Sequence, residues 1–99
     1  MPRVMFTISY SIKPEQRSNY MSLIAEIKSH MVTVTKKNYS VFELKGKKNQ
    51  FTEIYFFENT EEFEALDDNQ DERIQELLSK LEECVDNGGK KYTTFVETV

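Results

Sequence analysis

The chain has 99 residues, of which 38% are hydrophobic and 30% are charged, and a formal net charge of −4. This size and composition indicate a single globular domain spanning residues 1–99 and exclude a low-complexity or disordered chain. The only cysteine, Cys84, excludes an intrachain disulfide, and no apolar run reaches the roughly 20 residues of a membrane span, so we expect a cytoplasmic protein without a membrane partner.

The chain begins with a predicted strand and a predicted helix. Alternation with a period of two predicts a strand whose apolar face is formed by Val4, Phe6, Ile8, Tyr10 and Ile12. Pro14 suits the first turn of a helix, because its missing N–H is not needed there. Apolar residues then recur at spacings of three and four from Tyr20 to Met31, which predicts a helix over residues 14–29.

A β-hairpin is predicted next. Residues 39–44 and 51–58 are rich in β-branched and aromatic side chains, and the polar segment 45–49 between them contains Gly46. A glycine-containing turn between two such runs joins antiparallel neighbours. We therefore expect these two strands to pair.

The remainder of the chain predicts a divided helical region and a final strand. Asn59 and Asn69 are each followed three residues later by a glutamate, which is the spacing of a helix N-cap. The second helix is predicted to end at residues 87–89, where glycine can adopt the left-handed cap conformation. Its apolar stripe consists of Ile74, Leu77, Leu78, Leu81 and Val85. Residues 92–96 predict the final strand.

This order of elements predicts the α+β, ferredoxin-like βαββαβ fold, a four-stranded antiparallel sheet with both helices on one face. The strand over residues 51–58 has large apolar side chains on both faces, whereas a sheet face in water is normally polar. We assign one of these faces to a subunit interface, because sheet-to-sheet pairing of two copies would bury it. That face comprises Phe51, Glu53, Tyr55 and Phe57. A homodimer is thus expected.

Two segments carry a family resemblance. Ile12-Lys13-Pro14-Glu15 closes the first strand and opens the first helix, and residues 51–65 run from an aromatic strand into acidic residues, a phenylalanine and an alanine. Together they resemble the dimeric α/β-barrel, antibiotic-biosynthesis-monooxygenase-like superfamily. The resemblance implies ferredoxin-like subunits packed sheet against sheet, and activities that include cofactor-independent oxidation of aromatic polyketides and haem degradation.

The resemblance does not extend to a catalytic set. The haem-degrading branch has Asn on the first strand and Trp and His near the second helical region, whereas this chain has Thr7 and Ser9 on that strand, no Trp, and no His after Leu66. The resemblance therefore implies the fold and the dimer but no catalytic residue. We expect no cofactor.

Two side chains remain candidates for proton transfer. His30, the only imidazole, lies near the end of a predicted helix, where a side chain that interacts with the helix terminus or with solvent is the simpler interpretation. Glu53 lies between two aromatic residues, and a buried carboxylate there would have a raised pKa and could act as a base, unless it is paired or exposed at an edge.

Ligand contacts are predicted for four tyrosines: Tyr10, Tyr39, Tyr55 and Tyr92.

Metal and nucleic-acid sites are not predicted. The acidic run over residues 61–72 fails the EF-hand spacing, because Glu72 stands where glycine is required and Leu78 where the bidentate glutamate belongs. Residues 50–55 lack the glycine of an RNA-recognition strand and place a carboxylate among the rings. The basic segment 45–48 is expected to be solvated or, alternatively, to face an acidic helix of a second subunit.

Two functions remain. One is the binding of a small hydrophobic ligand by a dimer, in a pocket between the sheet and the helices that is lined by tyrosine and phenylalanine. The other is that of a cofactor-independent monooxygenase or isomerase acting on a small aromatic molecule, with Glu53, His30 or a tyrosine transferring a proton. The enzyme requires an open cavity on which at least two polar side chains converge, whereas a structural dimer would fill that space.

Overall fold

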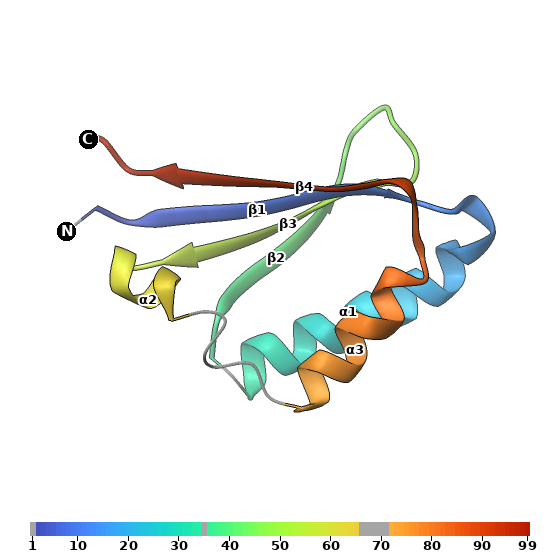
Figure 1. Cartoon of the computed structure of the whole chain (residues 1–99), viewed down its shortest axis with the longest axis horizontal. Coiled ribbons are helices and arrows are strands. Elements are labelled where there is room, and N and C mark those ends of the chain that lie inside the picture. Colours follow the sequence, from blue (N-terminus) through green and yellow to red (C-terminus); the bar gives the residue numbers. More distant parts are fainter. Residues whose placement is uncertain (1, 35, 66–71) are drawn as a thin grey trace.

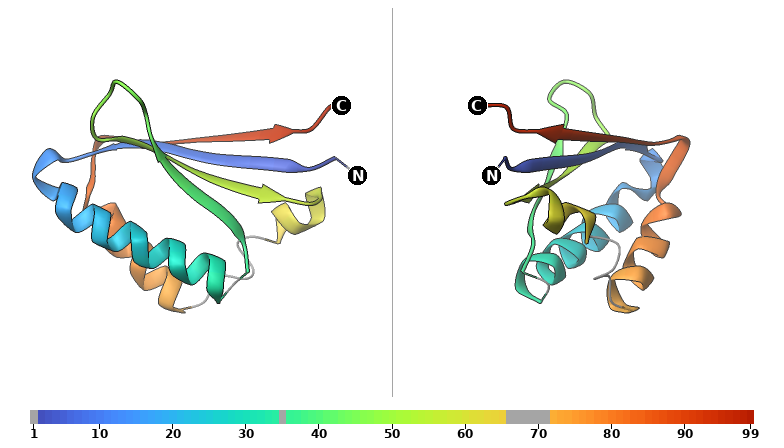
Figure 2. Two further views of the ribbon diagram at one scale, coloured as in Figure 1. Left: turned by 180° about the vertical axis from the view of Figure 1, so that it is seen from behind. Right: turned by 60° about the vertical axis from the view of Figure 1, so that its left-hand side comes forward.

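The computed structural model of the chain describes residues 2–34, 36–65 and 72–99. In chain order the elements are β1 (Val4–Ile12), a short 3₁₀ helix (Pro14–Gln16), α1 (Arg17–Thr33), β2 (Asn38–Glu43), β3 (Gln50–Phe57), α2 (Thr60–Glu64), α3 (Glu72–Glu82) and β4 (Val85–Val96). The strands form one antiparallel sheet in the order β2-β3-β1-β4. Figure 1 and Figure 2 show the helices on one face of this sheet, which confirms the ferredoxin-like fold.

The hydrophobic core lies between the sheet and the helices. Alternate residues of β1 point toward the helices, and Val4, Tyr10 and Ile12 are buried there. The buried stripe of α1 consists of Tyr20, Ile24, Ile27 and Met31. Because Met31 extends this stripe, α1 continues past its predicted end to Thr33. α3 packs along α1 on the same side of the sheet, as the right-hand view in Figure 2 shows.

The boundary between α3 and β4 differs from the prediction. α3 ends at Glu82, and the predicted helix end at residues 87–89 is wrong. Val85 instead begins β4 and pairs with Ile12 of β1, so residues 86–89 are inserted opposite a single residue as a bulge. The φ angle of Gly89 is +74°, a left-handed conformation that glycine adopts without a steric penalty. The glycines therefore serve a strand bulge and not a helix cap.

The assignment of the faces of β3 was also wrong. The row of Phe51, Glu53, Tyr55 and Phe57 is buried against the helices and does not form the outer face of the sheet. The pairing with β1 explains this result, because Glu53 lies opposite Ile8, which belongs to the apolar row of β1. Residues opposite each other in paired strands share a face. The outer face of β3 therefore carries Thr52, Ile54 and Phe56.

Helix α2 begins as predicted. The side chain of Asn59 accepts a hydrogen bond from the backbone N–H of Glu62 at 2.9 Å, which satisfies one of the free donors of the first turn. The second predicted cap, Asn69, lies outside the described residues, as does part of the acidic run 61–72. Among the residues that the structure describes, no helix is both long and apolar enough to cross a membrane.

Candidate functional site

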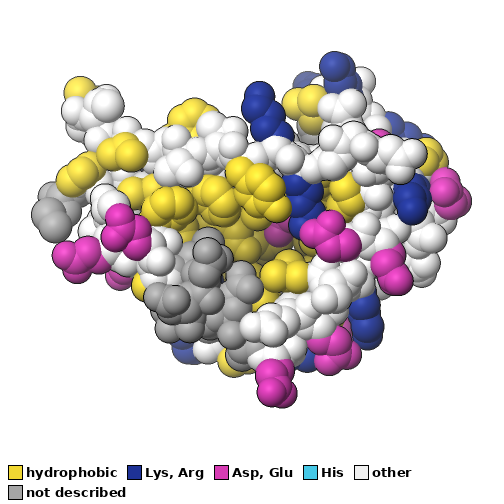
Figure 3. Space-filling model, in the orientation of Figure 1, with side chains coloured by type: hydrophobic (Ala, Val, Ile, Leu, Met, Phe, Trp, Pro, Cys, Tyr) yellow, Lys and Arg dark blue, Asp and Glu magenta, His cyan; other side chains and the backbone are white. Residues whose placement is uncertain are grey.

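A cavity of about 510 Å³ lies on the helical side of the sheet, against α2 and α3. Figure 3 shows a hollow lined by hydrophobic side chains there, with basic and acidic side chains at one end. The lining residues are Phe6, Ile8, Glu53, Tyr55, Phe63, Glu64, Leu78, Glu82, Lys90 and Tyr92. The volume falls in the range of small-molecule sites, roughly 300–1,000 Å³.

The floor of the cavity is built by the strand register. Ile8 at the centre of β1 lies opposite Glu53 of β3 on one side and opposite Tyr92 of β4 on the other. Phe6, two residues earlier, lies opposite Tyr55. Because opposite residues and every second residue of a strand share a face, all five side chains reach the same side of the sheet.

Aromatic rings form one wall. The ring of Phe6 lies 5.4 Å from that of Phe63 and 6.1 Å from that of Tyr92, measured between centroids. The ring of Tyr55 lies 6.1 Å from that of Phe6 and 4.8 Å from that of Tyr39. These separations are those of favourable aromatic pairs. The wall offers an apolar surface to which a flat ring can bind.

Glu53 places a carboxyl group in this apolar surrounding. Its side chain is 1% exposed, and Oε1 accepts a hydrogen bond of 2.5 Å from the hydroxyl of Tyr39. Burial raises the pKa of Glu53 above its ordinary value, and hydrogen bonds from Tyr39 and Tyr10 and the charge of Lys90 oppose that rise. Glu53 therefore keeps its proton to a higher pH than an exposed glutamate does.

Buried phenols support Glu53 from behind the cavity. The hydroxyls of Tyr10 and Tyr20 lie 2.8 Å apart, and both rings are buried. Burial raises the pKa of Tyr10 and of Tyr39 well above the ordinary value, and the neighbouring Glu53 raises both further. These phenols therefore stay neutral and act as hydrogen-bond donors.

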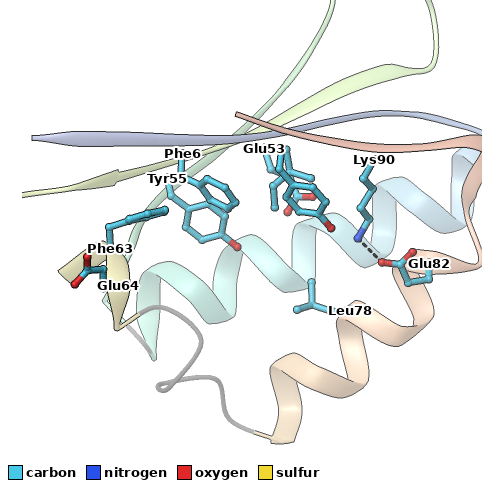
Figure 4. Close-up of a pocket in the computed structure, with 10 residues that line it drawn as sticks. Phe6, Glu53, Tyr55, Phe63, Glu64, Leu78, Glu82 and Lys90 are labelled. Carbon is cyan, nitrogen blue, oxygen red and sulfur yellow. Dashed lines mark hydrogen bonds and ion pairs between the residues drawn. The ribbon is translucent and has the colours of Figure 1, made fainter. Parts of the chain in front are cut away.

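An ion pair closes the opposite end of the cavity. Lys90 of β4 and Glu82 of α3 form a salt bridge, drawn as the dashed line in Figure 4. The side chain of Lys90 is 12% exposed, whereas that of Glu82 is 59% exposed. The positive charge of the pair is thus the buried one.

The structure separates the predicted site residues into three groups. Glu53, Tyr55 and Tyr92 line the cavity. Tyr10 and Tyr39 lie in the core behind Glu53, where they act through hydrogen bonds and do not form the cavity wall. His30 lies in the last turn of α1 and is not among the described residues that line the cavity.

Other lining residues were not predicted from the sequence. Phe6 was assigned to the apolar face of its strand but not to a site, and Phe63 was noted only in the family resemblance. Lys90 was missed because the final strand was predicted to begin at residue 92, after the lysine. Lys90 and Tyr92 are two residues apart, so they share a face if the strand begins before residue 90. This spacing is the signal that could have identified Lys90.

Comparison with known proteins identifies the fold. No family model and no curated protein matches the chain. A conserved protein from Methanosarcina mazei has a solved structure with a TM-score of 0.83 at 14% identity, covering 99% of this chain and 95% of that one. A proposed antibiotic biosynthesis monooxygenase from Caulobacter crescentus has a TM-score of 0.79 at 5% identity, with coverage of 99% and 91%.

A third similar structure has a described activity. SnoaB from Streptomyces nogalater, a cofactor-independent oxygenase, has a TM-score of 0.71 at 13% identity and covers 94% of this chain and 90% of that one. These likenesses confirm the ferredoxin-like fold, which this chain shares with SnoaB and with structures described as antibiotic biosynthesis monooxygenases. At such identities the likeness concerns the fold alone.

Proposed function

We propose that this protein binds a small hydroxylated aromatic molecule in the cavity between the sheet, α2 and α3. The observation that carries the proposal is the combination of an aromatic wall with one buried carboxyl group, Glu53. A flat ring would pack against Phe6 and Phe63, and its hydroxyl would hydrogen-bond to Glu53. A cavity of about 510 Å³ has room for a compound of two or three fused rings.

Filling the cavity is expected to weaken binding. The test uses 2-naphthol and isothermal titration calorimetry. Replacing Leu78 with Trp adds a large side chain to the wall formed by α3, and we expect the affinity to fall by at least about tenfold, or 1.4 kcal/mol. Ser79→Trp, on the exposed side of the same helix, is the matched control and should bind as the unmodified protein does. Equal affinity of the Leu78 variant would place the ligand elsewhere.

A second candidate function is cofactor-independent oxidation, or isomerisation, of such a molecule. Its support is Glu53, a carboxyl group with a raised pKa next to the space where the ring would lie, which is the arrangement of a general base. SnoaB, which shares the fold, is a cofactor-independent oxygenase. In the oxidation, ionised Glu53 would take the hydroxyl proton and the electron-rich anion would be oxidised by dioxygen, with one oxygen atom entering the ring and the other released as water. In an isomerase, proton removal and return would suffice.

Oxygen consumption separates the two functions. With 1,5-dihydroxynaphthalene as the substrate, the enzyme is expected to consume oxygen faster than buffer, and the rate should rise with pH as Glu53 loses its proton. Glu53→Gln should reduce the rate by about a hundredfold or more, the usual contribution of a general base. A rate equal to that of buffer, together with intact binding of 2-naphthol, would leave ligand binding as the function.

We also propose that the protein forms a homodimer through the outer face of its sheet. This face carries exposed aromatic side chains from three strands: Phe42, Phe56 and Phe95. No helix of the described residues covers it, as Figure 1 shows. A two-fold axis lets such a patch cover itself, and burying one phenylalanine contributes about 2 kcal/mol.

A further inference from the structure

Lys90 is a shielded positive charge whose partner is easily withdrawn. Its ammonium group lies in the cavity wall with 12% of the side chain exposed. A charge removed from water to this extent requires an opposite charge nearby. Glu82 supplies that charge, but the side chain of Glu82 is itself 59% exposed. Glu82 can therefore return to water at little cost, whereas Lys90 cannot.

Lys90 and Glu53 flank the same space. Both project from the sheet into the cavity, as Figure 4 shows. They lie on β4 and β3, the two neighbours of β1, and are offset by two residues along the strands, so their backbones are roughly 12 Å apart. The oxygen atom of a bound molecule of two fused rings can thus reach either Glu53 or the ammonium group of Lys90.

The other charges of the cavity do not neutralise Lys90 from within. Lys90 is the only basic residue among the described residues that line the cavity. Glu64 is exposed on α2, where solvent screens its charge. Glu53 hydrogen-bonds to Tyr39, and its burial favours the neutral carboxyl group. The end of the cavity at Lys90 therefore favours an anion that can take the place of Glu82.

We infer that Lys90 binds the oxygen of the ligand when its hydroxyl is ionised, whereas Glu53 binds it when it is neutral, and that Glu82 is a counterion which the aryloxide displaces. The inference rests on the proposed function of the cavity and identifies the ionisation state of the ligand that is bound. The exchange conserves charge, because Lys90 loses one carboxylate and gains one aryloxide while Glu82 is rehydrated. Lys90 thereby selects ligands that are acidic enough to ionise over those that are not.

The inference is tested by the ionisation of bound 2-naphthol, followed by the absorbance of naphtholate as the pH is raised. The unmodified protein is expected to bind naphtholate about tenfold to a hundredfold more tightly than neutral naphthol, as charge-assisted hydrogen bonds allow, so the pKa of the bound probe falls. Lys90→Met should abolish this preference while affinity for neutral naphthol changes less than about twofold. Lys91→Met, on the outer face of the same strand, is the matched control and should keep the preference.

A second variant tests the counterion without touching Lys90. Glu82→Gln removes the competing carboxylate, so we expect naphtholate to bind several-fold more tightly than it binds to the unmodified protein. An unchanged preference in Lys90→Met, or weaker naphtholate binding in Glu82→Gln, would overturn the inference while leaving the proposed function intact. If the unmodified protein binds neither form of 2-naphthol, both the proposed function and the inference fail. Circular dichroism of each variant verifies that it is folded.

Discussion

Replacing Glu53 with Gln is expected to stabilise the protein at neutral and alkaline pH. In the folded protein, burial raises the pKa of Glu53 above the value of 4.5 that an unperturbed glutamate has. Between these two values the native state holds a proton that the unfolded chain has released, so the free energy of unfolding of the unmodified protein falls as the pH rises. Gln keeps the hydrogen bond from Tyr39 but does not ionise. We expect a gain of about 1–3 kcal/mol at about pH 8.

Urea unfolding at about pH 4 and about pH 8 measures this gain. The difference between the variant and the unmodified protein should be small at the acidic pH and should grow as the pH rises through the raised pKa of Glu53. Glu64→Gln is the control, because Glu64 also lines the cavity but is exposed, and its effect should stay within about 0.5 kcal/mol. A loss of stability in Glu53→Gln at the alkaline pH would show that the native state favours the ionised carboxylate.

Replacing Phe56 with Glu is expected to convert the proposed dimer into a monomer. Phe56 is exposed on the outer face of β3, and the two-fold axis of a sheet-to-sheet dimer would bury two copies of the new carboxylate. Burying a charge without a partner costs several kcal/mol in practice, so the dissociation constant should rise by about a thousandfold or more. Sedimentation velocity over a range of concentrations measures the change. Because Phe56 contributes to the exposed face, the fold of the monomer should be retained.

The control for this experiment is Met21→Glu, which places the same charge on the exposed side of α1. Its mass in solution should equal that of the unmodified protein. If the unmodified protein is a monomer at all concentrations, the outer face has a different partner and the dimer proposal fails. If Phe56→Glu remains a dimer while the unmodified protein is also one, the subunits pair through another surface.

The sequence was sufficient to predict the order of the elements and the fold. The period-two alternation in β1 and the three- and four-residue spacing in α1 each place most of the apolar side chains on the side of the element that faces the core. The turn around Gly46 likewise defines the β2–β3 hairpin, where the φ angle of this glycine is +87°. These local signals agree with the observed topology because each is imposed by the burial of one side of one element.

The faces of β3 and the site could not be predicted in the same way. Both rows of β3 are apolar, and only the register with β1 decides which row faces the helices. The start of β4 depends on pairing between Val85 and Ile12, which are far apart in the chain. The environment of Glu53 follows from these long-range choices, so its place beside the cavity became visible only with the sheet assembled.

The cavity takes part of its wall from α3, whereas its buried carboxyl group and its lysine come from the sheet. Glu53 and Lys90 belong to the sheet, whereas Leu78 belongs to α3. Substitutions of Leu78 can therefore widen or narrow the cavity without altering Glu53 or Lys90. Changes confined to one helix can thus alter the size of the molecule that the cavity admits, in evolution or by design.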